Sequence, residues 1–157
     1  MEYSDKIAEK IEAYLREENW AYDFDTIHGA FSVEAELSCS LNTVLIVTQL
    51  QTDGFVTYAS LPVEAPARCR DAIGEYLHRA NYGLACGNFE MNYDDGEIHF
   101  KVFVGCADEN PSRQQIADSF IIPLAVIDHY GDGIAALAGG EPSAAKRLID
   151  QVDNKLD

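Results

Sequence analysis

The fold is decided by residues 42–61, which read NTVLIVTQLQTDGFVTYASL. Residues 44–50 are apolar on both faces, a pattern typical of a central strand. Residues 55–61 are rich in aromatic and β-branched side chains, which favour a second strand. Thr52-Asp53-Gly54 lies between the two runs and is typical of a tight turn. The sequence therefore predicts an antiparallel hairpin at the centre of a sheet.

A third strand is predicted directly before this hairpin. From Phe31 to Cys39 apolar and polar side chains alternate, which is the period of a strand with one buried face. A helix from about Ser4 to Glu18 precedes it, because apolar side chains recur there at helical spacing. A second helix is expected after Pro66 and should end at Gly83, where a left-handed residue closes a helix most easily.

A second hairpin is expected around Asp95-Gly96, taken as a two-residue loop. Glu90 would then meet Lys101 on one face, and a slip by one residue would lose this pair of opposite charges. On the apolar face, this register pairs Tyr93 with Ile98, Met91 with Phe100, and Phe89 with Val102.

The remaining sequence predicts helices. Ser112 can cap a long helix to about Tyr130, which Pro123 should kink or split. Gly139-Gly140 would end a further short helical piece, and a last helix is expected from Pro142 to about Lys155. The order helix, three strands, helix, two strands, helix predicts an α+β fold, with an antiparallel sheet of about five strands and helices packed on it. Residues 1–157 would form a single domain with a C-terminal helical extension from about residue 134.

Charge and composition exclude some classes of function and of partner. The chain has 157 residues and a formal net charge of −16 at pH 7, a field that repels polyanions, so no nucleic acid is expected as a partner. No basic and apolar leader is visible, and the apolar run from Phe120 to Ile127 is far shorter than the roughly 20 residues that span a bilayer. We therefore expect a cytoplasmic protein that does not bind membranes. The spacing of the four cysteines favours reduced, mostly buried thiols.

Two stretches of the chain resemble a known family. They read HRANYGLACGNFEMNYDDGEI at residues 78–98 and DHYGDGI at residues 128–134, the latter followed by Gly139-Gly140. Both are similar to the YbjN-domain family. The resemblance implies a bacterial protein with a fold like the type III secretion chaperones and a role in regulating sensory transduction, and it brings no agreed enzymatic activity. Gly131-Asp132 stands where such proteins often carry Leu-Pro.

The residues from Asn81 to Gly87 also have an interpretation of their own, which is structural first and a ligand site second. Asn81 and Gly83 can end a helix, and Tyr82 and Leu84 can anchor it. Gly87 would let the backbone pass close to a neighbour.

Metal and cofactor sites are not expected. Cys86 near His99, or Cys69 near His78, would supply pairs of ligands, whereas a zinc site needs three or four. No phosphate-binding loop or dinucleotide fingerprint is present in the sequence.

A hydrolytic triad of Asp128 and His129 with Ser119 or Cys106 is disfavoured. Neighbouring residues of a helix point about 100° apart, so Asp128 could not orient His129 well. We therefore expect a protein that is not an enzyme.

Apolar side chains remain that one helical layer could not cover. On the outer face of the sheet these would be Leu45, Val47, Val56, Tyr58 and Phe103. A contiguous exposed apolar area usually marks association, but the C-terminal helix could instead fold over it. The aromatic stretch containing Trp20, Tyr22 and Phe24 is a second candidate contact, or else an edge strand with one buried face.

Two hypotheses follow. The first is a protein-binding module, regulatory or chaperone-like, that forms a homodimer and holds another protein through its sheet and first helix. The second is a small-molecule binder or enzyme with a pocket between sheet and helices, using Tyr76, His78 or His99.

Overall fold

The hairpin of residues 42–61 lies at the centre of a six-stranded sheet in the computed structural model, which describes residues 2–140 and 147–151. The strand order is β1-β2-β3-β4-β6-β5, and each neighbouring pair is antiparallel. The strands are β1 (Asp23–Asp25), β2 (Ala30–Glu36), β3 (Thr43–Leu50), β4 (Gly54–Ser60), β5 (Asn88–Met91) and β6 (Ile98–Gly105). The predicted α+β class is confirmed, and the sheet has one more strand than expected because residues 23–25 pair with β2.

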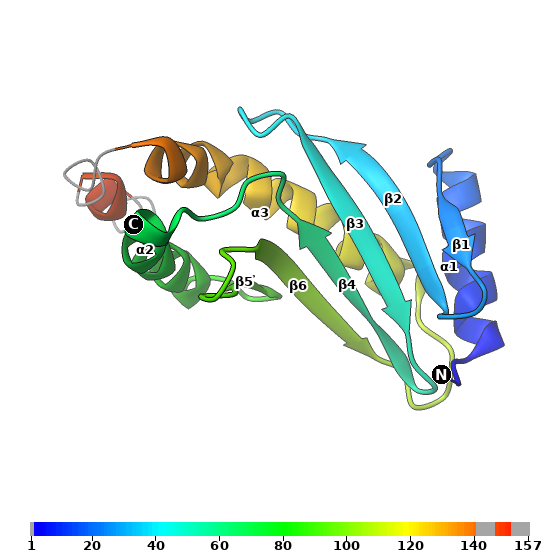
Figure 1. The fold of residues 1–157 in the computed structure, drawn as a ribbon. Coiled ribbons are helices and arrows are strands. Elements are labelled where there is room, and N and C mark those ends of the chain that lie inside the picture. Colours follow the sequence, from blue (N-terminus) through cyan, green and yellow to red (C-terminus); the bar gives the residue numbers. More distant parts are fainter. Residues whose placement is uncertain (1, 141–146, 152–157) are drawn as a thin grey trace.

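The helices pack on one face of this sheet. They are α1 (Asp5–Glu17), the 3-10 helix η1 (Ala67–Cys69), α2 (Arg70–Tyr82) and α3 (Arg113–Gly139). Figure 1 looks onto the opposite face, with α3 passing behind the central strands. Phe31, Phe55 and Phe100 from the sheet and Phe120 from α3 are among the largest fully buried side chains, so the core lies between the sheet and the helices.

Local chemistry explains where the first helix begins. The hydroxyl of Ser4 accepts a hydrogen bond from the Ile7 amide and so caps one of the free N–H groups of the first turn. Ile7, Ile11 and Leu15 recur every four residues and are fully buried. The predicted helix from about Ser4 to Glu18 is therefore confirmed to within one residue at each end.

The second hairpin has a different register from the predicted one. Phe89 lies opposite Phe100 and Met91 opposite Ile98, a shift of two residues. The loop is longer than two residues because the Gly96 amide donates to the Asn92 carbonyl and the Asn92 amide donates to the Glu97 carbonyl. A shift of two leaves each side chain on its predicted face. The loop is also tied to α2, because the guanidinium of Arg70 donates to the carbonyl oxygens of residues 93 and 94.

The third helix does not break. We expected Pro123 to kink or split it, but α3 runs unbroken from Arg113 to Gly139, with Pro123 inside it. Ile116 and Phe120 are buried before the proline and Ile127 and Ile134 after it. Burial of both halves compensates the backbone hydrogen bond that proline removes. The separate piece expected before Gly139-Gly140, and the start of an extension at residue 134, both belong to α3.

Two further details concern helix ends. Gly83 ends α2 as predicted, but its φ of −93° is not left-handed, so that part of the expectation was wrong. Of the last predicted helix, residues 147–151 are helical, and the rest of the range 142–155 lies outside the described residues.

One described helix, α3, is long and apolar enough to cross a membrane by length and composition, with a mean hydropathy of 1.3 over its most apolar window. The core helix of a soluble protein meets the same criteria. Since α3 buries Ile116, Phe120, Ile127 and Ile134, its composition is compatible with a soluble protein.

Candidate functional site

The uncovered face of the sheet brings together five apolar residues that the sequence predicted there, which we name the sheet patch: Leu45, Val47, Val56, Tyr58 and Phe103. Val47 lies opposite Tyr58, and Val56 lies opposite Phe103. Leu45 is 48% exposed and Phe103 is 61% exposed, while Val56 is covered by its neighbours. The patch is therefore contiguous across the three strands β3, β4 and β6.

Among residues 2–140 and 147–151, no helix covers this patch. In Figure 1 α3 passes behind the strands, and residues 147–151 lie beyond the sheet, at the end of the molecule where α2 is. The expectation that the C-terminal helix folds over the patch is not met by those residues, because Ile149 is buried as part of the core. Residues 142–146 and 152–155 of the predicted helix lie outside the described residues.

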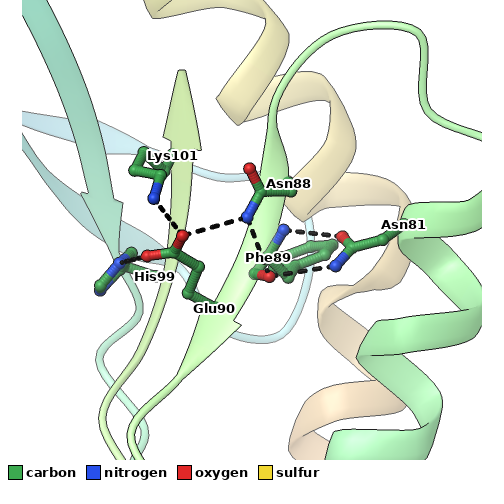
Figure 2. Close-up of polar contacts among 6 residues, drawn as sticks. All are labelled: Asn81, Asn88, Phe89, Glu90, His99 and Lys101. Atoms are coloured by element: carbon green, nitrogen blue, oxygen red, sulfur yellow. Dashed lines mark hydrogen bonds and ion pairs between the residues drawn. The ribbon is translucent and has the colours of Figure 1, made fainter. Parts of the chain in front are cut away.

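A polar cluster continues the same face toward β5 (Figure 2). The carboxylate of Glu90 contacts the Nε2 atom of His99 at 2.9 Å and accepts hydrogen bonds from Lys101 and from the Asn88 amide. The ring of His99 in turn stands edge-on to Tyr58, with centroids 5.2 Å apart. Tyr58 thus joins the sheet patch to the charged cluster, so the uncovered face is apolar at its centre and charged at one side.

The charge of Glu90 is fixed by these contacts. Partial burial by itself raises the pKa of the carboxyl group, but hydrogen bonds from Lys101, His99 and Asn88 outweigh it and lower the pKa to about 2. A carboxylate with such a low pKa is a poor general base near neutral pH. The cluster is therefore suited to pairing charges across a contact rather than to moving protons. The predicted register placed Glu90 opposite Lys101, whereas the actual register, shifted by two residues, places it opposite His99.

The aromatic stretch lies on the covered side of the sheet instead. Phe24 stacks on the buried Phe31 at 4.2 Å between ring centroids, and Tyr22 meets the same ring edge-on at 5.8 Å. Trp20 meets Phe120 of α3 edge-on at 5.5 Å. These contacts match the alternative interpretation, an edge strand with one buried face. Trp20, Tyr22 and Phe24 are thus partly buried against the core and separate from the sheet patch.

In the segment at residues 81–87, the side chain of Asn81 has a structural role. Its side-chain carbonyl oxygen accepts a hydrogen bond from the Phe89 amide at 2.7 Å, and its side-chain nitrogen donates to the Phe89 carbonyl at 3.0 Å (Figure 2). One side chain of α2 thus satisfies both backbone groups of an edge-strand residue. Gly87 has a φ of +74°, and a Cβ atom there would lie 2.5 Å from the Phe100 ring, so the predicted close approach is confirmed.

Tyr82 does not anchor this segment. We expected Tyr82 and Leu84 to anchor the end of the helix, but the Tyr82 side chain is 92% exposed at the end of α2, whereas Leu84 is partly buried against the core. The buried side of α2 is formed by Ile73, Leu77 and Ala80, and Tyr82 falls outside that stripe.

Asp128 has a structural partner in place of a catalytic one. Its carboxylate accepts hydrogen bonds from the backbone amides of Ser38 and Cys39 at 2.7 and 3.1 Å. The Asp132 carboxylate accepts one from the Ser40 amide at 2.8 Å. Between them, a Cβ atom at Gly131 would lie 2.6 Å from the sulfur of Cys39. The sequence Gly131-Asp132 therefore allows the β2–β3 loop to pack directly on α3.

The residues of the small-molecule hypothesis do not converge. Tyr76 is buried under α3 and donates its hydroxyl hydrogen bond to the Tyr130 carbonyl at 3.1 Å. His78 is exposed on α2, and His99 lies on the uncovered face of the sheet. Three residues that point to three different environments cannot line one pocket between sheet and helices.

Metal-ligating groups are also dispersed. Within residues 2–140 and 147–151, no three His, Cys, Asp or Glu side chains gather closely enough to hold a metal ion. Cys39, Cys69 and Cys106 are free and buried, and Cys86 is free and exposed. Burial raises the pKa of the Cys39 and Cys106 thiols, which keeps them protonated and unreactive.

Comparison of the sequence with protein-family models and with curated proteins gave no match.

Proposed function

We propose that the chain is a non-enzymatic, cytoplasmic protein-binding module that forms a homodimer through the uncovered face of its sheet. The observation that carries the proposal is the sheet patch, whose residues Leu45 and Phe103 are 48% and 61% exposed on the uncovered face of an otherwise well-packed domain. Contiguous exposed apolar area on a soluble protein commonly marks a contact with another protein.

The surroundings of the patch support a specific protein contact rather than nonspecific hydrophobic association. Tyr58 and Phe103 are aromatic anchors of the kind that dominate interfaces, and the Glu90 cluster supplies a charged rim on one side. A second copy of the chain would carry the same arrangement, so a two-fold axis through the patch would place apolar centre against apolar centre.

A regulatory or chaperone-like role is part of the proposal. It draws on the resemblance of residues 78–98 and 128–134 to the YbjN-domain family, and we propose membership of that family. The non-enzymatic part is supported by Glu90 and Asp128, whose carboxylates are engaged in structural hydrogen bonds.

The test is the oligomeric state in solution, measured by light scattering over a wide range of protein concentrations. We expect a dimer for the native chain and a monomer with unchanged circular dichroism for the double variant Val47→Asp/Tyr58→Glu. Thr52→Asp, on the exposed turn between β3 and β4, is the matched control and should leave the dimer intact. A native chain that stays monomeric at every concentration would refute the proposal.

A further inference from the structure

The edge of the sheet at β2 is only half occupied. Strand β1 has three residues, and its pairing with β2 stops where Asp23 lies opposite Ser32. Strand β2 continues to Glu36, so its segment Val33–Glu36 extends past the end of β1. On its other side this segment is fully paired with β3, from Val33 through Glu36.

The alternation of a β-strand decides which backbone groups face the open edge. The Leu37 amide donates to the Asn42 carbonyl on the β3 side, and the backbone groups of successive residues point to opposite sides. The N–H and C=O groups of Glu34 and Glu36 therefore point outward, away from β3. Within the described part of the chain no strand lies opposite them.

A groove of about 430 Å³ runs along this open edge. Its apolar lining comes from Trp20 before β1, from Val33 and Ala35 of β2 and from Leu124 of α3. One helical turn before Leu124, on the same side of α3, Ile121 is 52% exposed and extends the apolar surface.

The rim of the groove is acidic. Glu34 and Glu36 are among its lining residues and are exposed, while Glu18, which also lines it, has its carboxylate paired with the Arg113 guanidinium. The side chains of Glu34 and Glu36 lie on the uncovered face of the sheet, whereas Val33 and Ala35 point to the helix side. The whole chain carries a formal net charge of −16, which strengthens the attraction for a cation.

The opposite edge of the sheet, at β5, is blocked at one residue. There the side chain of Asn81 takes both the N–H and the C=O of Phe89, so β5 offers those groups to no incoming strand. Edge strands are commonly protected in this way against unwanted pairing. The contrast favours the β2 edge for backbone pairing, because no side chain of the described residues takes the outward groups of Glu34 and Glu36 in the way that Asn81 takes those of Phe89.

We infer that the β2 edge groove binds an extended segment of a partner protein in which apolar and basic residues alternate. The segment adds a strand beside Glu34 and Glu36, in line with β1, and exchanges backbone hydrogen bonds with them. Its apolar side chains point to the helix side and contact Trp20, Ala35 and Leu124. Its Lys or Arg side chains point to the other side, beside the Glu34 and Glu36 carboxylates. The inference rests on the proposed function only in that the chain binds proteins, since its backbone contacts lie at the β2 edge, although Glu34 lies opposite Leu45 of the sheet patch.

The single tryptophan of the chain is Trp20, so its fluorescence reports directly on the groove. The probe is a short end-capped peptide in which lysine and valine alternate. We expect this peptide to bind saturably. A peptide of the same sequence that is N-methylated at alternate amides should bind at least about tenfold more weakly, because its backbone donors are lost. A peptide with the same composition but with lysines and valines in separate blocks should also bind at least about tenfold more weakly.

Variants of the chain separate strand addition from simple charge attraction. Glu34→Lys/Glu36→Lys should abolish binding of the alternating peptide, and Leu124→Asp should weaken it while the rim charges remain. Glu64→Lys/Glu97→Lys changes two exposed carboxylates elsewhere and should retain most of the affinity. Equal binding of the alternating, blocked and N-methylated peptides would overturn the inference, and so would the absence of any saturable change at Trp20.

The same titration on Val47→Asp/Tyr58→Glu keeps the two proposals apart. Peptide binding that persists in this variant supports the groove whether or not the native chain is a dimer. A native chain that is dimeric but binds no peptide would agree with dimerisation through the sheet patch and would refute peptide binding in the groove.

Discussion

The two faces of the sheet are built on the same strands but are stabilised in different ways. On β6, Phe100 is fully buried against the helices, while Phe103, three residues later, points to the uncovered side and is 61% exposed. The covered face depends on close packing around aromatic rings, and the uncovered face has an apolar patch beside a charged cluster. The stability of the fold therefore comes mainly from the covered face. The other face is available for binding.

The largest expected effect compares the two phenylalanines directly. Phe100→Ala should lower the free energy of unfolding by about 3–5 kcal/mol, because it leaves a cavity beside Phe89. Phe103→Ala should change the stability of the monomer by less than about 0.5 kcal/mol. Urea unfolding of both variants measures the difference, and equal losses would show that the uncovered face also contributes to the core.

The next effect concerns the link between α2 and the edge strand. Asn81→Ala removes the partners of both Phe89 backbone groups and should cost about 1–3 kcal/mol. Amide hydrogen exchange of Phe89 should accelerate more than that of Phe100, which lies one strand further in. Asn81→Asp keeps the acceptor and loses the donor, so its stability should fall between those of the native chain and the alanine variant.

A smaller effect is expected for a polar pair within the covered face. Thr48 and Thr57 lie opposite each other, are fully buried and join their hydroxyl groups at 3.0 Å. Thr48→Val leaves the Thr57 hydroxyl without this partner and should cost about 1–2 kcal/mol. The double variant Thr48→Val/Thr57→Val should recover most of that loss. A double-mutant cycle on thermal unfolding measures the coupling, and strictly additive losses would contradict it.

The smallest effect belongs to the charged cluster on the uncovered face. The folded-state pKa of Glu90 is about 2, below its ordinary value of 4.5, so its ionised form stabilises the fold. This contribution is complete above pH 4.5 and is lost as the pH falls from 4.5 toward 2. Below pH 4.5 the melting temperature of Glu90→Gln should therefore approach that of the native chain. Glu64→Gln, an exposed position outside the cluster, is the control, and a gap that stays constant with pH would contradict the assignment.

The position of a site residue could be predicted from the sequence where its own strand sets it, but not where another element sets it. Alternation along β3, β4 and β6 was enough to place Leu45, Val47 and Phe103 on one face, because side chains of a strand point to opposite sides in turn. The contact of His99 with Glu90 could not be predicted, because it depends on the register of the second hairpin. The loop of that hairpin is held by a hydrogen bond from Arg70 of α2. No pattern within residues 33–36 shows that β1 stops short of them.

Local periodicity by itself determined the α+β class, the central hairpin, the first helix and the apolar side of each strand, because these follow from how successive side chains point. Only the tertiary structure decided the register of the second hairpin, the unbroken course of α3 past Pro123 and the roles of Asn81 and Asp128. Each of these depends on atoms that another element supplies, such as the Phe89 backbone for Asn81 and the Ser38 amide for Asp128. Such partners are fixed by the free energy of the whole packed domain, which local sequence patterns do not encode.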